Sequence, residues 1–172
     1  MGSSFSPRRS AIISVMKPRV YLDTSIPSAY YDQRSQFKWR KDITREWWQY
    51  HRRHYQLYIS YSVLYELEHG AYPHKREILD LVEDLSILDT VQQIDDIVSI
   101  YGRNKLTPKG DHGDSWHLAI ASYYKLDYLL TWNCKNLANA NKMGHIESIS
   151  KKHRLWIPRL ITPEQLFWLP RK

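Results

Sequence analysis

The feature that most constrains this chain is a series of short apolar segments, each separated from the next by a helical pattern. Such segments stand at 19–22, 57–60, 86–88 and 127–131, and a last one opens the sequence RLITPEQL near the end of the chain. Short strands separated by helices predict an α/β fold whose parallel sheet is covered by helices on both faces. A sheet of this kind binds ligands outside the carboxyl ends of its strands.

Helical patterns fill the intervals between these strands. A short helix with Pro27 in its first turn is expected at 26–31, and Thr162 and Pro163 should cap and begin the last helix. The other expected helices are 42–53, one after Ser60 that runs to about Gly70, 75–85, 94–101 closed by Gly102, an almost wholly apolar helix within 110–126, 136–143 and 146–153. No repeat or linker divides these segments, so we expect residues 16–172 to form a single domain.

Residues 1–15 have a different character from the rest. They contain basic residues and only a very short apolar core, which makes a poor signal peptide, and we expect a disordered N-terminal extension. No apolar run approaches the length of a membrane span. The single cysteine, Cys134, excludes an internal disulfide framework and a cysteine-based zinc site. A reducing compartment follows, and we expect a cytoplasmic protein.

The charge of the chain favours a polyanionic partner. The formal net charge is +7, and a basic protein attracts nucleic acid. Basic residues dominate from Asp32 to Gln56, where three acids stand against Arg34, Lys38, Arg40, Lys41, Arg45, Arg52 and Arg53. Trp and Tyr side chains within this stretch can stack on unpaired bases, although packing in the core is the more frequent role of any single Trp.

Three acids stand where predicted strands end or helices begin. Asp23 follows the first strand in VYLDTS, and an isolated buried charge needs a basic partner or a cation. Glu66 lies on the same helical face as Val63 and Leu67, which is a mostly inward stripe; its alternative role is an ion pair with an arginine. Asp114 opens the apolar helix, where an acid can also stabilise the helix simply by complementing its dipole.

Carboxylates that converge in this way form an oxygen site suited to Mg²⁺ or Mn²⁺. Their mutual repulsion is severe without a cation. A bound cation polarises a phosphate, lowers the pKa of a bound water and stabilises a leaving oxygen. We therefore expect Asp23, Glu66 and Asp114 to bind Mg²⁺ or Mn²⁺, with Asp111 as a weaker candidate. His117, one turn beyond Asp114, is expected to be a hydrogen-bonded core residue.

Four motifs resemble PIN-domain proteins, in particular the VapC-like branch of bacterial toxin–antitoxin systems: VYLDTSIPS, YISYSVLYELEHG, GDSWHLAIASYYKLDYLLTWNCKNLANA and ITPEQL. The resemblance runs from about Val20 to Leu166. It implies a three-layer α/β/α domain with a central parallel sheet and a Mg²⁺- or Mn²⁺-dependent ribonuclease that cleaves RNA. It also implies a homodimer and a cognate antitoxin that silences the enzyme by covering its groove.

The resemblance also assigns roles by position. The first three family acids correspond to Asp23, Glu66 and Asp114, and the hydroxyls of Thr24 and Ser25 would order a metal-bound water or meet the substrate. The fourth acid of many members falls on Asn133, the fourth expected catalytic residue. Its amide offers an oxygen but no charge, so we expect one tightly bound ion and a second bound weakly.

The expected contacts with RNA lie after the strand at 127–131 and in the basic stretch. Lys135 and Asn136 are candidates to contact the substrate backbone, and Trp132 is expected to pack rather than stack on a base. A positively charged track for the substrate would consist of Arg40, Lys41, Arg45, Arg52 and Arg53.

Three alternatives remain open at the level of sequence. Because Asn133 lacks the charge of a fourth acid, the chain could be a nucleic-acid-binding protein whose catalytic site is weak or inactive. A DNA nuclease ranks lower, because the chain has neither an arch-like insertion nor a second DNA-binding module. A structural or partner-binding protein, whose acids are capped and paired, would gain no stability from a metal ion.

Overall fold

The computed structural model describes residues 16–106, 112–135 and 137–168. Two candidate residues, Asp111 and Asn136, lie outside this set, and so does the N-terminal extension expected at 1–15. Within these ranges, no helix combines the length and the apolar character needed to cross a membrane.

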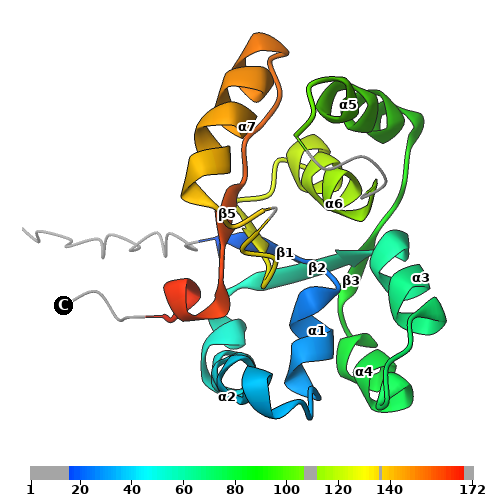
Figure 1. The fold of residues 1–172 in the computed structure, drawn as a ribbon, viewed down its shortest axis with the longest axis vertical. Coiled ribbons are helices and arrows are strands. Elements are labelled where there is room, and N and C mark those ends of the chain that lie inside the picture. Colours follow the sequence, from blue (N-terminus) through cyan, green and yellow to red (C-terminus); the bar gives the residue numbers. More distant parts are fainter. Residues whose placement is uncertain (1–15, 107–111, 136, 169–172) are drawn as a thin grey trace, which may run out of the picture.

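A five-stranded sheet forms the centre of the molecule (Figure 1). Its strands are β1 (Arg19–Leu22), β2 (Gln56–Ser60), β3 (Ser86–Leu88), β4 (Tyr128–Leu130) and β5 (Arg159–Ile161). They pair in the order β3-β2-β1-β4-β5, and every pair is parallel. The five apolar segments of the sequence are therefore the five strands, as predicted.

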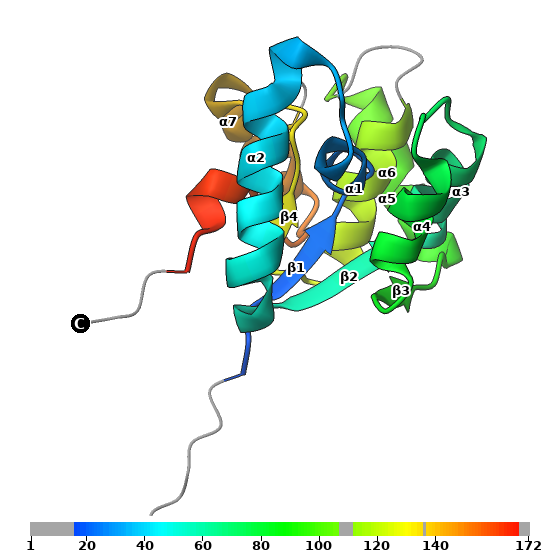
Figure 2. The same ribbon diagram turned by 90° about the horizontal axis from the view of Figure 1, so that it is seen from below.

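Helices cover both faces of this sheet in an α/β/α arrangement, which confirms the expected three layers (Figures 1 and 2). On one side lie α1 (Ser25–Tyr30), α2 (Lys38–Glu46) and α4 (Lys75–Val82), with α3 (Tyr61–His69) packed beside α4. On the other side lie α5 (Gln92–Arg103), α6 (His112–Tyr123) and α7 (Ala140–Lys152). A short 3₁₀ helix (Pro163–Leu166) follows β5.

Several helices differ from the predicted bounds; α4, for example, was expected to run to 85 and ends at Val82. The helix expected at 42–53 begins at Lys38 with α2 and continues as π-helical and 3₁₀ turns to His54. Residues 140–152 form one helix instead of two, and Gly102 lies inside α5 instead of closing it. A Cβ at Gly102 or at Gly144 would meet no atom within 4 Å. Both glycines therefore weaken their helices by roughly 1 kcal/mol without ending them.

The middle of the sheet is buried on both faces, which explains the unbroken apolar character of its strands. Val20, Tyr21 and Leu22 of β1 are fully buried, and so are Leu129 and Leu130 of β4. Buried polar side chains directly follow both strands: Asp23 and Thr24 come after β1, and Thr131 comes after β4.

The chain leaves β1 for β2 on one side of the sheet and later returns to form β4 on the other side. This reversal of strand order opens a crevice at the carboxyl ends of β1 and β4, where α/β proteins bind their ligands. Asp23 follows β1, and its backbone N–H still bonds to the carbonyl of Leu130, at 3.3 Å. Thr131 follows β4 and bonds in the same way to Ile161, at 2.9 Å. These two residues mark the position of the site.

Candidate functional site

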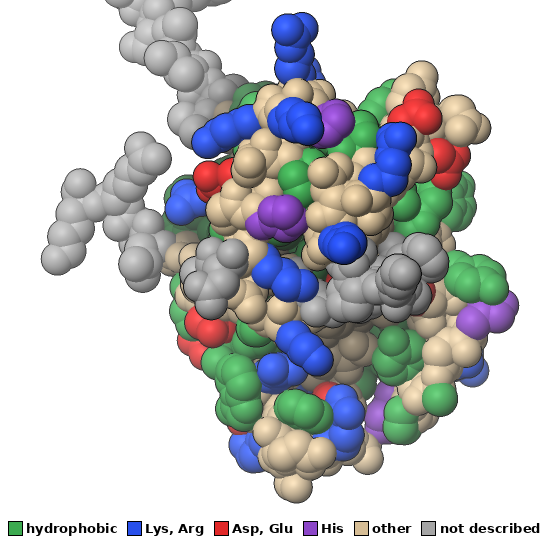
Figure 3. Space-filling view, turned by 45° about the horizontal axis from the view of Figure 1, so that its top comes forward, with side chains coloured by type: hydrophobic (Ala, Val, Ile, Leu, Met, Phe, Trp, Pro, Cys, Tyr) green, Lys and Arg blue, Asp and Glu red, His purple; other side chains and the backbone are tan. Residues whose placement is uncertain are grey.

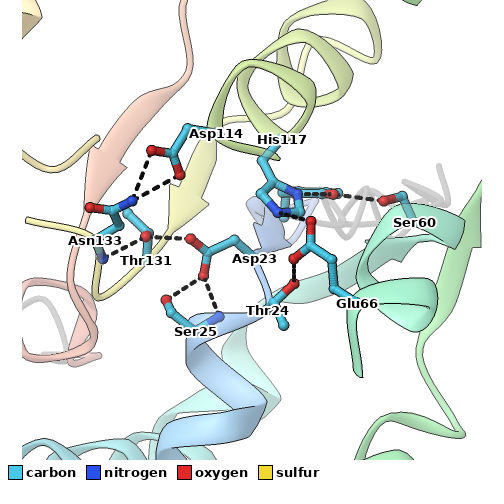
Figure 4. Close-up of polar contacts among 10 residues, drawn as sticks. Asp23, Thr24, Ser25, Ser60, Glu66, Asp114, His117, Thr131 and Asn133 are labelled. Atoms are coloured by element: carbon cyan, nitrogen blue, oxygen red, sulfur yellow. Dashed lines mark hydrogen bonds and ion pairs between the residues drawn. The ribbon is translucent and has the colours of Figure 1, made fainter. Parts of the chain in front are cut away.

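A pocket of about 640 Å³ opens at the carboxyl edge of the sheet. It brings together residues from the segment after β1, from α1, α3 and α6, and from the segment after β4. Its lining includes six of the residues predicted from the sequence: Asp23, Thr24, Ser25, Glu66, Asp114 and Asn133. Figure 4 shows Asp23 between Asp114 and Asn133 on one side and Glu66 and His117 on the other.

Asp23 lies at the bottom of this pocket and is only 3% exposed. Its carboxylate accepts hydrogen bonds from the hydroxyls of Ser25 and Thr131, and from the Ser25 backbone N–H at 3.0 Å. Burial raises the pKa of Asp23 above its ordinary value, although His117 and these hydrogen bonds oppose the shift. Among residues 16–106, 112–135 and 137–168, no lysine or arginine pairs with this acid. Asp23 is thus a buried acid stabilised by two hydroxyls, a backbone N–H and the nearby His117.

Glu66 projects from α3 and is half-buried, with 37% of its side chain exposed. One carboxylate oxygen accepts a hydrogen bond from the Thr24 hydroxyl, and the other lies 3.5 Å from Nε2 of His117. Burial would raise the pKa of Glu66, but its contacts with His117 and Thr24 hold that pKa below its ordinary value. The ion-pair partner of Glu66 is therefore a histidine and not the arginine considered from the sequence.

His117 connects this pocket to the core. It is buried, as predicted, and its Nδ1 lies 2.9 Å from the Tyr21 hydroxyl, which in turn lies 2.7 Å from the Ser60 hydroxyl. Burial opposes its protonated form, but Glu66 and the charges of Asp23 and Asp114 raise the pKa of His117 above its ordinary value. Its place in the pocket lining was not predicted, because its partners come from other elements of the fold.

Asp114 stands in the first turn of α6 and is buried. The side-chain nitrogen of Asn133 lies 2.8 Å and 2.9 Å from its two carboxylate oxygens. The Asn133 backbone N–H bonds to the Thr131 hydroxyl at 2.9 Å, which fixes the turn after β4. The amide therefore presents its nitrogen to Asp114, whereas the sequence led us to consider its oxygen as a donor to a metal.

The donors of this pocket suit a hard divalent cation in their chemistry. Asp23, Glu66 and Asp114 supply only oxygen atoms, which Mg²⁺ and Mn²⁺ prefer. In the described part of the chain, however, no three His, Cys, Asp or Glu side chains form a group that could hold a metal ion as they stand. Each acid is turned toward a neighbouring hydroxyl, histidine or amide. To bind a common ion, the carboxylates would have to shift from these positions.

Two further pockets adjoin the acidic one and extend it into a groove. One, of about 420 Å³, is lined by Ser25, Arg40, Asn133 and Lys135 among others. The other, of about 330 Å³, has Tyr31, Tyr72 and His74 in its walls. Ser28 and Arg34 line all three pockets. The face in Figure 3 carries Lys and Arg side chains at many points and Asp and Glu side chains at fewer. A surplus of positive charge attracts polyanions.

The structure separates the residues expected to contact RNA. Lys135 lines the groove, and so does Arg40. Arg45 instead donates a hydrogen bond to the carbonyl of Tyr30, and Arg52 lies over the ring of Trp48. Trp132 is buried and donates its indole N–H to Thr44 Oγ1 at 2.8 Å, so it packs as predicted.

The chain is similar to one protein family and to several solved structures. The family model described as PIN domain matches residues 20–135. The crystal structure of VapBC2 from Rickettsia felis bound to a DNA fragment from its promoter aligns with a TM-score of 0.47 and 16% sequence identity. The alignment covers 84% of this chain and 98% of that one. No curated protein is significantly similar in sequence.

Proposed function

The chain belongs to the PIN domain family, and we propose that it is a Mg²⁺- or Mn²⁺-dependent endoribonuclease that hydrolyses RNA phosphodiester bonds. One observation carries the proposal: Asp23, Glu66 and Asp114 line a single pocket at the point where the strand order reverses. A net charge of +7 and a groove lined by Arg40 and Lys135 support a polyanionic substrate.

Asp23, Glu66 and Asp114 would hold the cation. When bound, the cation would supply an activated water and stabilise the charge that develops on the phosphate. The protein orients the carboxylates. Ser25 donates to Asp23 and accepts a hydrogen bond from the Trp132 backbone N–H at 2.8 Å, so it ties the first acid to the turn after β4.

Hydroxyls and an amide position the remaining groups of the pocket. The Thr24 hydroxyl holds one oxygen of Glu66, and the Asn133 amide holds both oxygens of Asp114. His117 stands beside Glu66 with a raised pKa, so its protonated form balances part of the negative charge of the pocket. Asn136, the other residue expected to contact the RNA backbone, lies outside the described residues.

We further propose that the protein is the toxin of a type II toxin–antitoxin pair, acts as a homodimer and is silenced by a cognate antitoxin. The sequence motifs that resemble the VapC-like branch support this role. Induced expression should arrest bacterial growth, and expression of a short open reading frame next to the gene should restore it. Growth arrest that persists in an Asp23→Asn variant would contradict the toxin role.

The enzymatic proposal is tested by cleavage of pooled tRNA and ribosomal RNA. The assay compares the wild type with Asp23→Asn, each in Mn²⁺ and in EDTA, and a single-stranded DNA pool serves as the alternative substrate. Asp42→Asn is the matched control, because Asp42 is an exposed acid paired with Lys38 on α2. We expect discrete RNA fragments from the wild type and from the control in Mn²⁺ only, and none from Asp23→Asn.

The amide at Asn133 favours one other function, a nucleic-acid-binding protein with a weak catalytic site. In that case RNA binding would persist in Asp23→Asn, and the wild type itself would give no fragments. Cleavage of the DNA pool alone would instead support a DNA nuclease.

A further inference from the structure

Arg40 is a cation beside the acidic pocket whose charge no carboxylate of the described chain balances. Its guanidinium carbon lies 5.1 Å from the ring centroid of Phe37, 5.3 Å from that of Trp39 and 5.5 Å from that of Trp132. Its Nε atom is buried and has no hydrogen-bond partner. Within residues 16–106, 112–135 and 137–168, its side chain makes neither a hydrogen bond nor an ion pair.

Arg34, the other arginine of the groove, has a different environment. It bonds to Asp32 through Nε at 2.9 Å and through Nη2 at 2.6 Å, so a carboxylate already neutralises it. The face of an aromatic ring attracts a guanidinium. The ring does not, however, take up the N–H donors at the edge of the guanidinium as a carboxylate or a phosphate does. Arg40 is therefore held in place by rings, and no carboxylate of the described residues takes its N–H donors.

The position of Arg40 relates it to the acids. It lines the 420 Å³ pocket together with Ser25, Asn133 and Lys135. Ser25 and Asn133 also line the acidic pocket, where they hold Asp23 and Asp114. A ligand in the pocket of Arg40 would therefore contact Ser25 and Asn133, the two side chains that also contact Asp23 and Asp114.

We propose that Arg40, together with Lys135, binds the phosphate next to the scissile one in single-stranded RNA, and that Trp39 stacks on the adjoining base. This inference rests on the proposed ribonuclease function and names the substrate contacts of the same groove. Arginine matches a phosphate with two parallel N–H donors, so it fixes direction as well as charge. Trp39 is 49% exposed and meets Trp132 edge-on, which leaves part of its indole surface open to a base.

A purely structural role for Arg40 makes different predictions. Arg40 would then only tie α2 to the turn after β4 through the three rings. Arg40→Met keeps the aliphatic part of the side chain but removes the guanidinium with its charge and its donors. Arg40→Lys keeps the charge but not the planar pair of donors. A structural role predicts changes in melting temperature, whereas a phosphate contact predicts a change in the salt dependence of binding.

The test measures affinity for a fluorescein-labelled single-stranded RNA oligonucleotide in EDTA, where the metal-dependent reaction is off, at several salt concentrations. Arg45→Met is the matched control. Arg45 is on the same helix, lies 5.1 Å from the Tyr30 ring and lines none of the three pockets. We expect Arg40→Met to bind about ten-fold more weakly and to lower the slope of log affinity against log salt by about 1. Arg40→Lys should retain the slope, and Arg45→Met should change the affinity less than about two-fold.

Equal affinities and slopes for Arg40→Met and Arg45→Met would overturn the inference. If Arg40→Met does not fold, Trp39→Ala replaces it, and we expect an approximately five-fold loss of affinity with an unchanged salt slope; an unchanged affinity would refute the site. Failure of the two proposals can be told apart. If RNA binding depends on Arg40 but no cleavage occurs in Mn²⁺, only the proposed ribonuclease function is wrong. If cleavage depends on Asp23 and RNA binding does not depend on Arg40, only the proposed phosphate site is wrong.

Discussion

At the scale of single residues, the replacement of a charge by an amide at Asn133 is the most informative feature of the pocket. Asn133 donates to both oxygens of Asp114, at 2.8 Å and 2.9 Å. A carboxylate in its place would bring two negative charges within the same distance, and such pairs repel unless a cation or a proton lies between them. The amide therefore stabilises the pocket in the absence of a metal ion.

Asn133→Asp should make the protein depend more strongly on a divalent cation. In EDTA we expect it to lose roughly 1–3 kcal/mol of stability, because a buried carboxylate loses its donor and gains a like charge. In Mn²⁺ this loss should shrink, and cleavage of RNA should rise above that of the wild type. Melting curves and cleavage rates in both conditions are the measurements. An equal loss of stability in EDTA and in Mn²⁺ would show that the position does not face the metal.

Asp32 gives a prediction for acid stability. Hydrogen bonds from the Arg34 side chain and backbone hold the pKa of Asp32 below its ordinary value. A folded-state pKa below that of the unfolded chain stabilises the fold above about pH 4, and this contribution is lost as the pH falls through the folded-state pKa. Asp32→Asn should therefore cost up to about 1 kcal/mol at pH 7, since Arg34 is mostly exposed.

Urea unfolding at pH 7, 5 and 3 measures this difference. The stabilities of wild type and Asp32→Asn should differ at pH 7 and pH 5 and converge toward pH 3. A difference that stays constant down to pH 3 would mean that the Arg34 contact does not depend on the charge of Asp32.

At the scale of elements, the start of α6 sets the distance between two acids of the site. A Cβ at Gly113 would lie 3.2 Å from Oε1 of Glu66, closer than most side-chain contacts. The next residue, Asp114, belongs to the same pocket. The absence of a side chain at Gly113 thus allows α6 to approach Glu66 of α3.

Gly113→Ala should lower the cleavage activity without a comparable loss of stability. Alanine favours a helix over glycine by about 1 kcal/mol, so the melting temperature should not fall by much. The Glu66 carboxylate must shift by a few tenths of an ångström, and we expect cleavage to fall several-fold. Gly144→Ala in α7 is the control, because a Cβ there would meet no atom within 4 Å. It should stabilise the protein and leave cleavage unchanged; an equal loss of activity in both variants would contradict the role of Gly113.

The sequence predicted the strands better than the helices, for a physical reason. A parallel strand buried on both faces must be mostly apolar, so the segments at 19–22 and 127–131 were found and fall on β1 and β4. Helix ends depend on smaller energies. Gly102 was expected to close a helix, and 136–143 and 146–153 were expected to be two helices, yet Gly102 and Gly144 both lie inside helices.

The same contrast applies to the site. Asp23, Glu66 and Asp114 could be selected because each stands at the end of an element or on its inward face, and they do line one pocket. Their assignment as metal ligands stays a prediction. The contact between His117 and Glu66 and the donation from Asn133 to Asp114 join residues of different elements. No local pattern encodes such contacts, because they arise only when α3, α6 and the turn after β4 pack together.

At the scale of the whole molecule, the fold extends beyond the segment that matches the family. The match ends at residue 135, but β5 pairs with β4, and the Leu166 carbonyl accepts hydrogen bonds from Trp47 Nε1 at 3.2 Å and from the Tyr55 hydroxyl at 3.0 Å. The C-terminal elements are therefore tied to β4 and to the segment between α2 and β2. We propose that residues 16–172 unfold as one cooperative unit.

A metal ion should then stabilise the whole unit rather than the pocket alone. An ion that binds only the folded state adds RT ln(1 + [L]/Kd), which is about 2.7 kcal/mol when its concentration is 100 times its dissociation constant. Mn²⁺ should raise the midpoint of urea unfolding by the same amount whether the transition is followed by far-ultraviolet circular dichroism or by tryptophan fluorescence. EDTA should reverse the shift, because the acids of the pocket lose their common cation.

Asp23→Asn removes one charged ligand, so its midpoint should respond much less to Mn²⁺ than that of the wild type, whereas Asp42→Asn, an exposed acid outside the pocket, should respond fully. Two outcomes would be decisive against this view. Separate transitions for the two probes would divide the chain into independent units. A site that binds a cation only in the folded state must stabilise that state. If Mn²⁺ does not change the unfolding midpoint of the wild type, the three acids therefore bind no cation and have only a structural role, as capped and paired side chains.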